Sequence, residues 1–426
     1  MNKKPLHDNI IVGLDIGTAT VSALVGQLFP NGDIKVIGTG NSPTTGMNKG
    51  SVNDLKSVVK SIKQATYQAQ LTSDHPISNV FLSISGYHIS GKAERGMGTI
   101  SGKTVSQEDV DYTIHTARSI KIGDERKILH VIPQEFTIDG QGGIKNPLGL
   151  SGVRMEVSVY LISCHNHLAR NIIKAVERCG FKVNHLVYSG LAASYAVLTR
   201  EERELGVCIV DIGAGTMDVA VWTGGALRHT EVFSYAGNSV TDDIAFAFGT
   251  STSDAEEMKL SFGCAVRDPV IKDDAVGIST IRDPSSRSIQ RETLSEVIEP
   301  RYTELMLLVE RAINSMQEKL RSEGIRYNLS AGVVLTGGGA KMKGLSKCAE
   351  RVFSGQVRVG KPLLGMSVPN GYSGYSGGLH QSTAFGLLLY ARDNQINDIG
   401  WSMTKPESRS LSDVFSRLRN WIKKEF

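Results

Sequence analysis

The chain has 426 residues, of which 40% are hydrophobic, and a formal net charge of +4. This length allows two or three packed domains, and the small net charge argues against nucleic-acid binding over the whole surface. No apolar run reaches the roughly 18–20 residues of a membrane-spanning helix, and the polar residues 1–8 are unlike a signal peptide. The five cysteines form no Cys-x-x-Cys pair. We therefore expect a cytoplasmic protein with reduced thiols.

Residues 10–84 read as strand, turn, strand, helix and strand. The turn contains Asp15, Gly17, Thr18 and Thr20. Glycine would let backbone amides approach a phosphate chain, and a threonine hydroxyl could donate to it. A helix is expected over residues 53–71, with Asn53 as its N-cap.

Residues 85–163 interrupt this pattern. They contain glycine-rich turns, a helical stretch at 107–120, and alternating strands at 128–138 and 154–162. Nearly eighty residues with such patterns are too many for a structureless loop, so we predict a small inserted α+β subdomain. The residues Cys164-His165-Asn166-His167 resemble metal ligands, but no distant set completes them, and a helix start after a strand is favoured.

A second turn of the same kind lies within Ile209–Trp222. It contains Asp211, Gly213, Gly215, Thr216 and Asp218 between two apolar strands. A single glycine turn also fits a purely structural hairpin, but its repetition favours two similar halves that close on one nucleotide. Asp15 and Asp211 could hold the water shell of Mg²⁺, and Asp211 and Asp218 are candidate catalytic carboxylates.

A glycine run after a buried strand is a candidate for contacts with the rest of a nucleotide, whereas a charged pair on an earlier helix carries no such signal by itself. The apolar run Val333–Thr336 ends in Gly337-Gly338-Gly339, which brings backbone close to a flat ligand, and Lys341 follows. Glu256 and Lys259 lie one turn apart on a helix predicted over 253–262. The alternative for this pair is an exposed helix face with paired charges.

The C-terminal end has a different character. A last folded helix is expected over 382–391, followed by a flexible tether over 393–409. Residues 410–426 then place six apolar side chains on one helical face and four basic ones opposite, namely Leu411, Val414, Phe415, Leu418, Trp421 and Ile422 against Arg417, Arg419, Lys423 and Lys424. We interpret this helix as an anchor on an anionic membrane surface; the alternative is a helix that packs on the protein's own core.

The two turns and the glycine run, in this order, resemble the phosphate-one, phosphate-two and adenosine motifs of the actin and DnaK-type ATPase superfamily. The resemblance implies an α/β actin-like fold of two ribonuclease-H-like halves around a cleft that binds ATP and Mg²⁺. It also implies that Glu256 faces the ribose and Lys259 the base. Ser189 stands where these relatives carry the glutamate or glutamine that orients the attacking water. ATP hydrolysis is therefore expected to be slow.

More specific stretches resemble the FtsA family of bacterial cell-division proteins: Lys49–Leu55, Val131–Asp139, Asn146–Gly149, Glu299–Leu305 and the amphipathic tail. This resemblance implies an adaptor that polymerises, holds FtsZ filaments to the cytoplasmic face of the inner membrane, and recruits later division proteins through the insert. Arg301, Tyr302 and Glu304 match the stretch that binds the FtsZ tail, in a groove expected to be basic. The alternatives are a pilus-assembly adaptor and, further off, a kinase of the same fold.

These patterns divide the chain into nine segments. In order, they are the first half with the phosphate-one turn (1–84), the insert (85–163), the first half resumed (164–204), the second half with the phosphate-two turn (205–245), a smaller subdomain with the adenosine contacts and the FtsZ-tail groove (246–325), the second half resumed with the adenosine motif (326–378), a closing helix of the first half (379–392), the tether (393–409) and the membrane helix (410–426).

Overall fold

The computed structural model describes residues 9–119, 122–267, 275–278, 287–322, 324, 327, 329–353, 355–362, 366–367 and 378–397. The predicted membrane helix and residues 398–409 of the predicted tether lie outside the described residues. Helix α10 (Ser382–Asn397) continues past its expected end, so residues 393–397 are helical rather than part of a tether. No proline or glycine interrupts the chain between Leu387 and Asn397, which explains the longer helix.

Two large sheets carry the same strand pattern. The first has the order β11-β6-β1-β2-β3-β19 and the second β14-β13-β12-β17-β18. In each sheet, an antiparallel unit of three consecutive strands lies beside a parallel strand, β6 next to β1 and β17 next to β12. The repeated turn motif therefore belongs to a repeated fold.

The elements of the first half are β1 (Ile10–Ile16), β2 (Thr20–Leu28), β3 (Ile34–Pro43), β4 (Met47–Asn48), β5 (Ser51–Val52), α1 (Leu55–Ser73), β6 (Asn79–Ile84), α3 (Asn166–Glu177), β11 (Lys182–Tyr188), α4 (Ser189–Val197), α5 (Arg200–Leu205), β19 (Met366–Ser367) and α10. Helix α1 begins one residue later than expected, because Asp54 is its N-cap and the Asp54 side chain accepts the Lys56 amide at 3.0 Å. The strand β10 ends at His165 and α3 begins at Asn166, as predicted for that stretch.

The elements of the second half are β12 (Val207–Ile212), β13 (Met217–Thr223), β14 (Ala226–Phe233), α6 (Gly237–Phe248), α7 (Thr252–Phe262), β15 (Ala275–Ile278), β16 (Arg287–Gln290), α8 (Arg291–Ser322), β17 (Val333–Thr336), α9 (Leu345–Val352) and β18 (Val357–Val359). Short 3₁₀ turns cover Gly338–Lys341 and Leu379–Gln381. Helix α8 continues through Pro300, which lies inside it.

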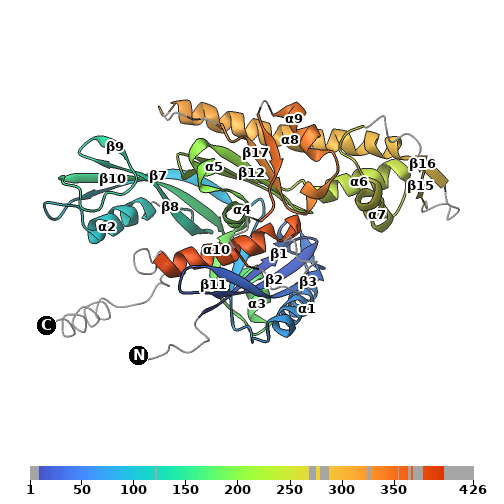
Figure 1. Cartoon of the computed structure of the whole chain (residues 1–426), viewed down its shortest axis with the longest axis horizontal. Coiled ribbons are helices and arrows are strands. Elements are labelled where there is room, and N and C mark those ends of the chain that lie inside the picture. Colours follow the sequence, from blue (N-terminus) through green and yellow to red (C-terminus); the bar gives the residue numbers. More distant parts are fainter. Residues whose placement is uncertain are drawn as a thin grey trace.

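The insert is a four-stranded sheet covered by one helix. It contains β7 (Ser90–Thr99), α2 (Gln107–Arg118), β8 (Arg126–Ile138), β9 (Gln141–Ile144) and β10 (Arg154–His165). The stretch expected to form glycine-rich turns includes the strand β7, and a Cβ at Gly96 would overlap the backbone of α2. The glycine therefore allows the helix to pack closely on the strand. In Figure 1 the insert projects at one end of the molecule, and β15 and β16 lie at the other.

The helices α4 and α10 pack together beside the first sheet. Their contact is close because a Cβ at Gly386 would overlap the carbonyl of Ala192. The small residues at this contact let the two helix backbones approach closely. Among the described residues, no helix combines the length and apolar character needed to cross a bilayer.

Candidate functional site

A cavity of about 470 Å³ lies between the two sheets and is lined by the tips of both hairpins. It brings together most of the predicted nucleotide-site residues: Asp15, Gly17, Thr18, Thr20, Asp211, Gly213, Thr216, Asp218, Glu256, Lys259, Gly337, Gly338, Gly339 and Lys341. Gly215 lines the neighbouring cavity instead, where its backbone lies against Thr18 and Lys49.

The two hairpin tips have the same turn. The amide of Gly17 donates to the carbonyl of Thr20 at 3.0 Å, and the amide of Gly213 donates to the carbonyl of Thr216 at 2.9 Å. A Cβ at either glycine would come within about 3.0 Å of that carbonyl oxygen. Both tips therefore leave backbone, not side chain, closest to the cavity, as a phosphate-binding turn requires.

Three carboxylates face this cavity, of which Asp211 and Asp218 are buried and Asp15 is half-buried. Asp211 and Asp218 are opposite each other in the β12–β13 pair, so both side chains lie on one face of the sheet. Burial raises the pKa of Asp15 to about 7 and that of Asp211 to about 6. Burial, and then the charge of Asp211, raise the pKa of Asp218 well above its usual value. Oxygen ligands and unbalanced negative charge suit a hard divalent cation such as Mg²⁺.

Each carboxylate accepts a hydrogen bond from a hydroxyl that the sequence analysis did not single out. Ser83 donates to Asp15 at 2.6 Å, Thr383 to Asp211 at 2.8 Å, and Ser85 to Asp218 at 2.7 Å. The signal available for Ser83 was its place at the end of the buried strand β6, since the ends of neighbouring parallel strands meet at one edge of a sheet and β6 lies beside β1. The contact of Thr383 depends on how α10 packs.

Lys259 was expected to contact adenosine, but all of the hydrogen bonds that its ammonium group can donate go to groups of the protein. It lies 3.0 Å from the carbonyl of Gly237, 2.8 Å from the hydroxyl of Thr241 and 2.7 Å from a carboxylate oxygen of Glu256. A lysine has three protons to donate, so these partners satisfy it. Contact between Lys259 and a base would therefore involve its aliphatic chain.

Gly337 is held in a conformation that other residues rarely adopt, with φ of +86°. A Cβ there would overlap the Asp211 side chain and the Ile212 backbone. The glycine run thus places backbone directly beside one of the three carboxylates. Ser189, the first residue of α4, also lines the cavity.

The residues expected in the FtsZ-tail groove separate onto two faces of α8. Arg301 donates to both carboxylate oxygens of Asp243, at 2.6 and 2.8 Å, and to Glu304 at 2.6 Å. Tyr302 is 1% exposed, lines the nucleotide-site cavity, and its hydroxyl lies 3.4 Å from the Gly339 carbonyl. The buried Tyr302 side chain therefore faces away from the groove of Arg301 and Glu304.

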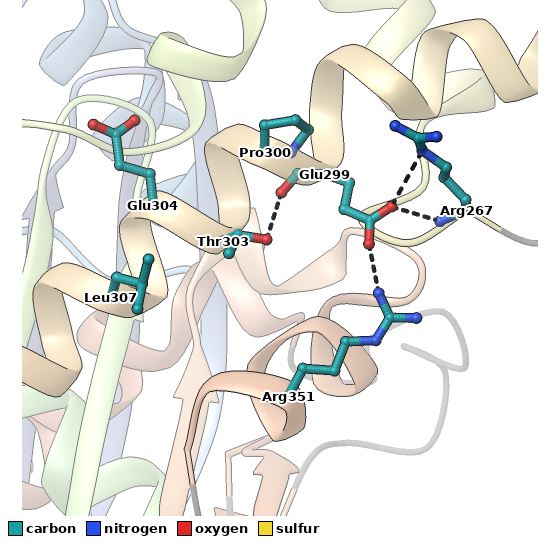
Figure 2. A pocket seen from close by; sticks show the side chains of 7 residues that line it. All are labelled: Arg267, Glu299, Pro300, Thr303, Glu304, Leu307 and Arg351. Atoms are coloured by element: carbon teal, nitrogen blue, oxygen red, sulfur yellow. Dashed lines mark hydrogen bonds and ion pairs between the residues drawn. The ribbon is translucent and has the colours of Figure 1, made fainter.

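The surface around Arg301 is balanced in charge rather than basic. The groove combines Arg301, Asp243 and Glu304 with the apolar side chains of Val297, Pro300 and Phe246, of which Phe246 is 91% exposed. A second pocket shares Pro300 and Glu304 with this groove, and Figure 2 shows that the carboxylate of Glu299 lies there between Arg267 and Arg351. Each described arginine here has a carboxylate partner, so the simple expectation of a basic groove does not hold.

Comparison with known proteins identifies the family. The family model for "Cell division protein FtsA" matches residues 208–377, and that for the "SHS2 domain inserted in FTSA" matches 86–163. The cell division protein FtsA of Escherichia coli (strain K12) is 54% identical over 423 residues, which is 99% of this chain and 100% of that protein. The chain belongs to the FtsA family. The FtsA of Pseudomonas aeruginosa is 39% identical over 98% of both chains.

Solved structures agree on the fold of this FtsA family member. A PilM–PilN type IV pilus biogenesis complex matches with a TM-score of 0.64 and 17% identity, over 90% of this chain and 98% of that one. MreB5 of Spiroplasma citri bound to ADP matches with a TM-score of 0.55 and 15% identity, over 92% and 99%. The predicted actin-like α/β fold is thus confirmed, and the chain has an actin-like role in cell division. Family membership decides against the pilus-assembly and kinase alternatives.

Proposed function

We propose that the cavity binds ATP together with Mg²⁺. The observation that carries this proposal is the arrangement of two glycine turns and three carboxylates around one cavity. Carboxylates and a phosphate chain repel each other, so both fit the cavity only with a cation between them. Asp15 and Asp211 would hold the water shell of the ion, and the turns at Gly17 and Gly213 would bind phosphate oxygens.

The remaining predicted residues complete the nucleotide site. Thr18, Thr20, Gly215 and Thr216 belong to the phosphate turns, and Glu256, Lys259, Gly337, Gly338, Gly339 and Lys341 to the adenosine end. Hydrolysis would be slow, because Ser189 has a hydroxyl where a glutamine or glutamate would orient water, although Asp211 and Asp218 lie in the same cavity.

The test is a titration of the protein with ATP, with and without Mg²⁺, followed by calorimetry. Asp15→Asn should lower the affinity for Mg·ATP at least tenfold, and the exposed Asp33→Asn should leave it unchanged. Equal affinity of the Asp15→Asn and wild-type proteins would reject the site.

We further propose that the protein polymerises through actin-like contacts and anchors FtsZ filaments to the membrane at the division site. Family membership and the amphipathic pattern of residues 411–426 support this. Each basic residue near an anionic leaflet contributes about 1 kcal/mol, so a single helix binds reversibly and a polymer binds tightly. The insert would recruit later division proteins.

The proposed anchoring of FtsZ filaments to the membrane is tested by co-sedimentation with vesicles of anionic lipid. The full chain should carry FtsZ to the vesicles, and a chain lacking residues 411–426 should leave FtsZ in the supernatant. Sedimentation of the truncated chain to the same extent would reject the anchor.

The FtsZ tail would bind along the exposed side of α8 at Arg301 and Glu304. Because Arg301 is already paired with Asp243 and Glu304, an acidic tail must take the place of one carboxylate. Glu304 is the partner on the surface, with 58% of its side chain exposed. The exposed Phe246 and Pro300 offer the apolar part of the contact.

A further inference from the structure

Ser85 lies where three parts of the molecule meet. It follows β6 in the first half, it lines the cavity, and it comes directly before Gly86, where the match to the inserted domain begins. Its hydroxyl is 2.7 Å from both carboxylate oxygens of Asp218 and 3.2 Å from the hydroxyl of Thr216. Asp218 and Thr216 belong to the second half. One side chain thus joins both halves at the point where the insert begins.

The backbone next to Ser85 is closely held. Gly86 has a φ of +136°, and its carbonyl accepts the amide of Ile89 at 3.0 Å. On the other side, a Cβ at Gly50 would come within 2.6 Å of the Ser85 carbonyl oxygen. A displacement of Ser85 therefore moves the turn that leads into β7, because the backbone on both sides of Ser85 is closely packed.

The entry and exit of the insert are joined by Arg126. One terminal nitrogen of its guanidinium donates to the carbonyl of His88 at 2.9 Å and to the carbonyl of Ser163 at 3.2 Å, and its Nε donates to the Ser163 hydroxyl at 3.1 Å. His88 is three residues after Ser85, and Ser163 is near the end of β10. A shift at the entry thus reaches the exit through one planar group with fixed geometry.

A second hydroxyl makes the same kind of contact without any chain connection to the insert. Thr383 donates to Asp211 at 2.8 Å, again from the first half to a buried carboxylate of the second. Thr383 lies on α10, which contacts α4 and the first sheet. The hydroxyls of Ser85 and Thr383 therefore make equivalent contacts between the two halves. They differ in that only Ser85 is adjacent to the insert along the chain.

We propose that Ser85 is a positioning residue that couples occupation of the phosphate end of the cavity to the orientation of the insert. This inference rests on the proposed Mg·ATP site. In the structure, the Ser85 hydroxyl donates a hydrogen bond to the Asp218 carboxylate. A cation with its water shell offers Asp218 stronger donors, so Ser85 changes partner when Mg·ATP enters, and the Ser85–Gly86 backbone follows.

The test is hydrogen–deuterium exchange of the full chain, with and without saturating Mg·ATP, in peptides that cover residues 86–99 and 126–138. Wild type should show nucleotide-dependent protection in both segments. Ser85→Ala should still bind Mg·ATP, because the ligand displaces the Ser85 hydroxyl from Asp218, but at saturation it should lose that protection. Thr383→Ala should also bind Mg·ATP and should keep the protection. Ser85→Thr, which retains a hydroxyl, should restore it.

Three outcomes would overturn the inference: full protection in Ser85→Ala at saturation, equal loss in Thr383→Ala, or failure of Ser85→Thr to restore it. Absence of Mg·ATP binding by wild type would refute the nucleotide site itself. Binding by wild type without any change in the insert would refute only the role of Ser85. Far-ultraviolet circular dichroism of each variant confirms that it is folded.

Discussion

Arg301 and Tyr302 are neighbours in α8, yet they contact different sites. The guanidinium of Arg301 binds Asp243 and Glu304 at the surface, and these hydrogen bonds raise its pKa above the usual range. The hydroxyl of Tyr302 lies against Gly339 in the nucleotide cavity. One turn of helix thus carries both the proposed FtsZ groove and part of the proposed nucleotide site. Successive helical residues point about 100° apart, which explains the division.

The first prediction separates these two faces. Arg301→Glu should lower the affinity for an FtsZ tail peptide at least tenfold, because the new carboxylate would face Asp243 and Glu304 and would repel an acidic peptide. Its affinity for Mg·ATP should change less than twofold. Fluorescence anisotropy of a labelled peptide and calorimetry measure the two affinities. Tyr302→Phe should leave peptide binding unchanged, and a clear loss in that variant would contradict the assignment of faces.

A second prediction concerns the glycine run. Gly337→Ala should destabilise the protein by about 3 kcal/mol, because the Cβ would overlap Asp211 and Ile212 at a positive φ. Gly338→Ala is the control, since its Cβ would meet only the His380 Cβ at 3.7 Å. Urea unfolding of both variants without nucleotide gives the comparison. Equal stability of the two would show that Gly337 is not under this constraint.

A third prediction is that the charged carboxylate of Asp15 lowers the free energy of unfolding of the protein when no nucleotide is bound. Burial raises the pKa of Asp15 to about 7, so the ionised carboxylate is disfavoured in the folded state at pH 8. Asp15→Asn keeps an acceptor for Ser83 and removes the charge. Without nucleotide, it should unfold at a higher urea concentration, with a free energy of unfolding up to about 4 kcal/mol larger than that of wild type, because the pKa shift from 3.8 to about 7 sets the upper limit. A loss of stability in this variant would contradict the proposed opposition between stability and binding.

A fourth prediction follows from His130, which accepts the amide of Tyr188 at 3.0 Å. Burial lowers its pKa to about 3. The unfolded chain takes up a proton on His130 near pH 6.5 and the folded chain does not. The free energy of unfolding is therefore highest above pH 6.5 and decreases as the pH falls. At pH 5 it should be about 2 kcal/mol lower than at pH 7.

His130→Gln keeps an acceptor and cannot be protonated in this range. Its free energy of unfolding should therefore change about 2 kcal/mol less than that of wild type between pH 7 and pH 5. His167→Gln, at an exposed position, should behave like wild type. The same pH dependence in all three proteins would exclude His130 as the cause.

The last prediction concerns the amphipathic tail. Trp421→Glu should abolish binding to anionic vesicles, because it places a charge on the apolar face of the helix. ATP binding should be unaffected. Vesicle co-sedimentation and calorimetry measure the two properties, and lipid affinity equal to that of wild type would remove the anchor hypothesis.

The sequence by itself determined the two turns, the glycine run, the insert and the actin-like fold. These features are local: an aspartate, a glycine and a threonine at fixed spacing define a turn, and apolar periodicity defines the strands that flank it. The family was also evident from short stretches such as Glu299–Leu305, because they depend on residue identity and order alone.

Only the tertiary structure decided which groups are paired. It connected Ser85 to Asp218 across 133 positions and Thr383 to Asp211 across 172, buried Tyr302, and satisfied the charges of Lys259 and Arg301. Such contacts depend on how separate elements pack, and neither residue of a pair carries a local signal of its partner. The charge of a groove and the donors of a buried carboxylate are therefore properties of the folded chain.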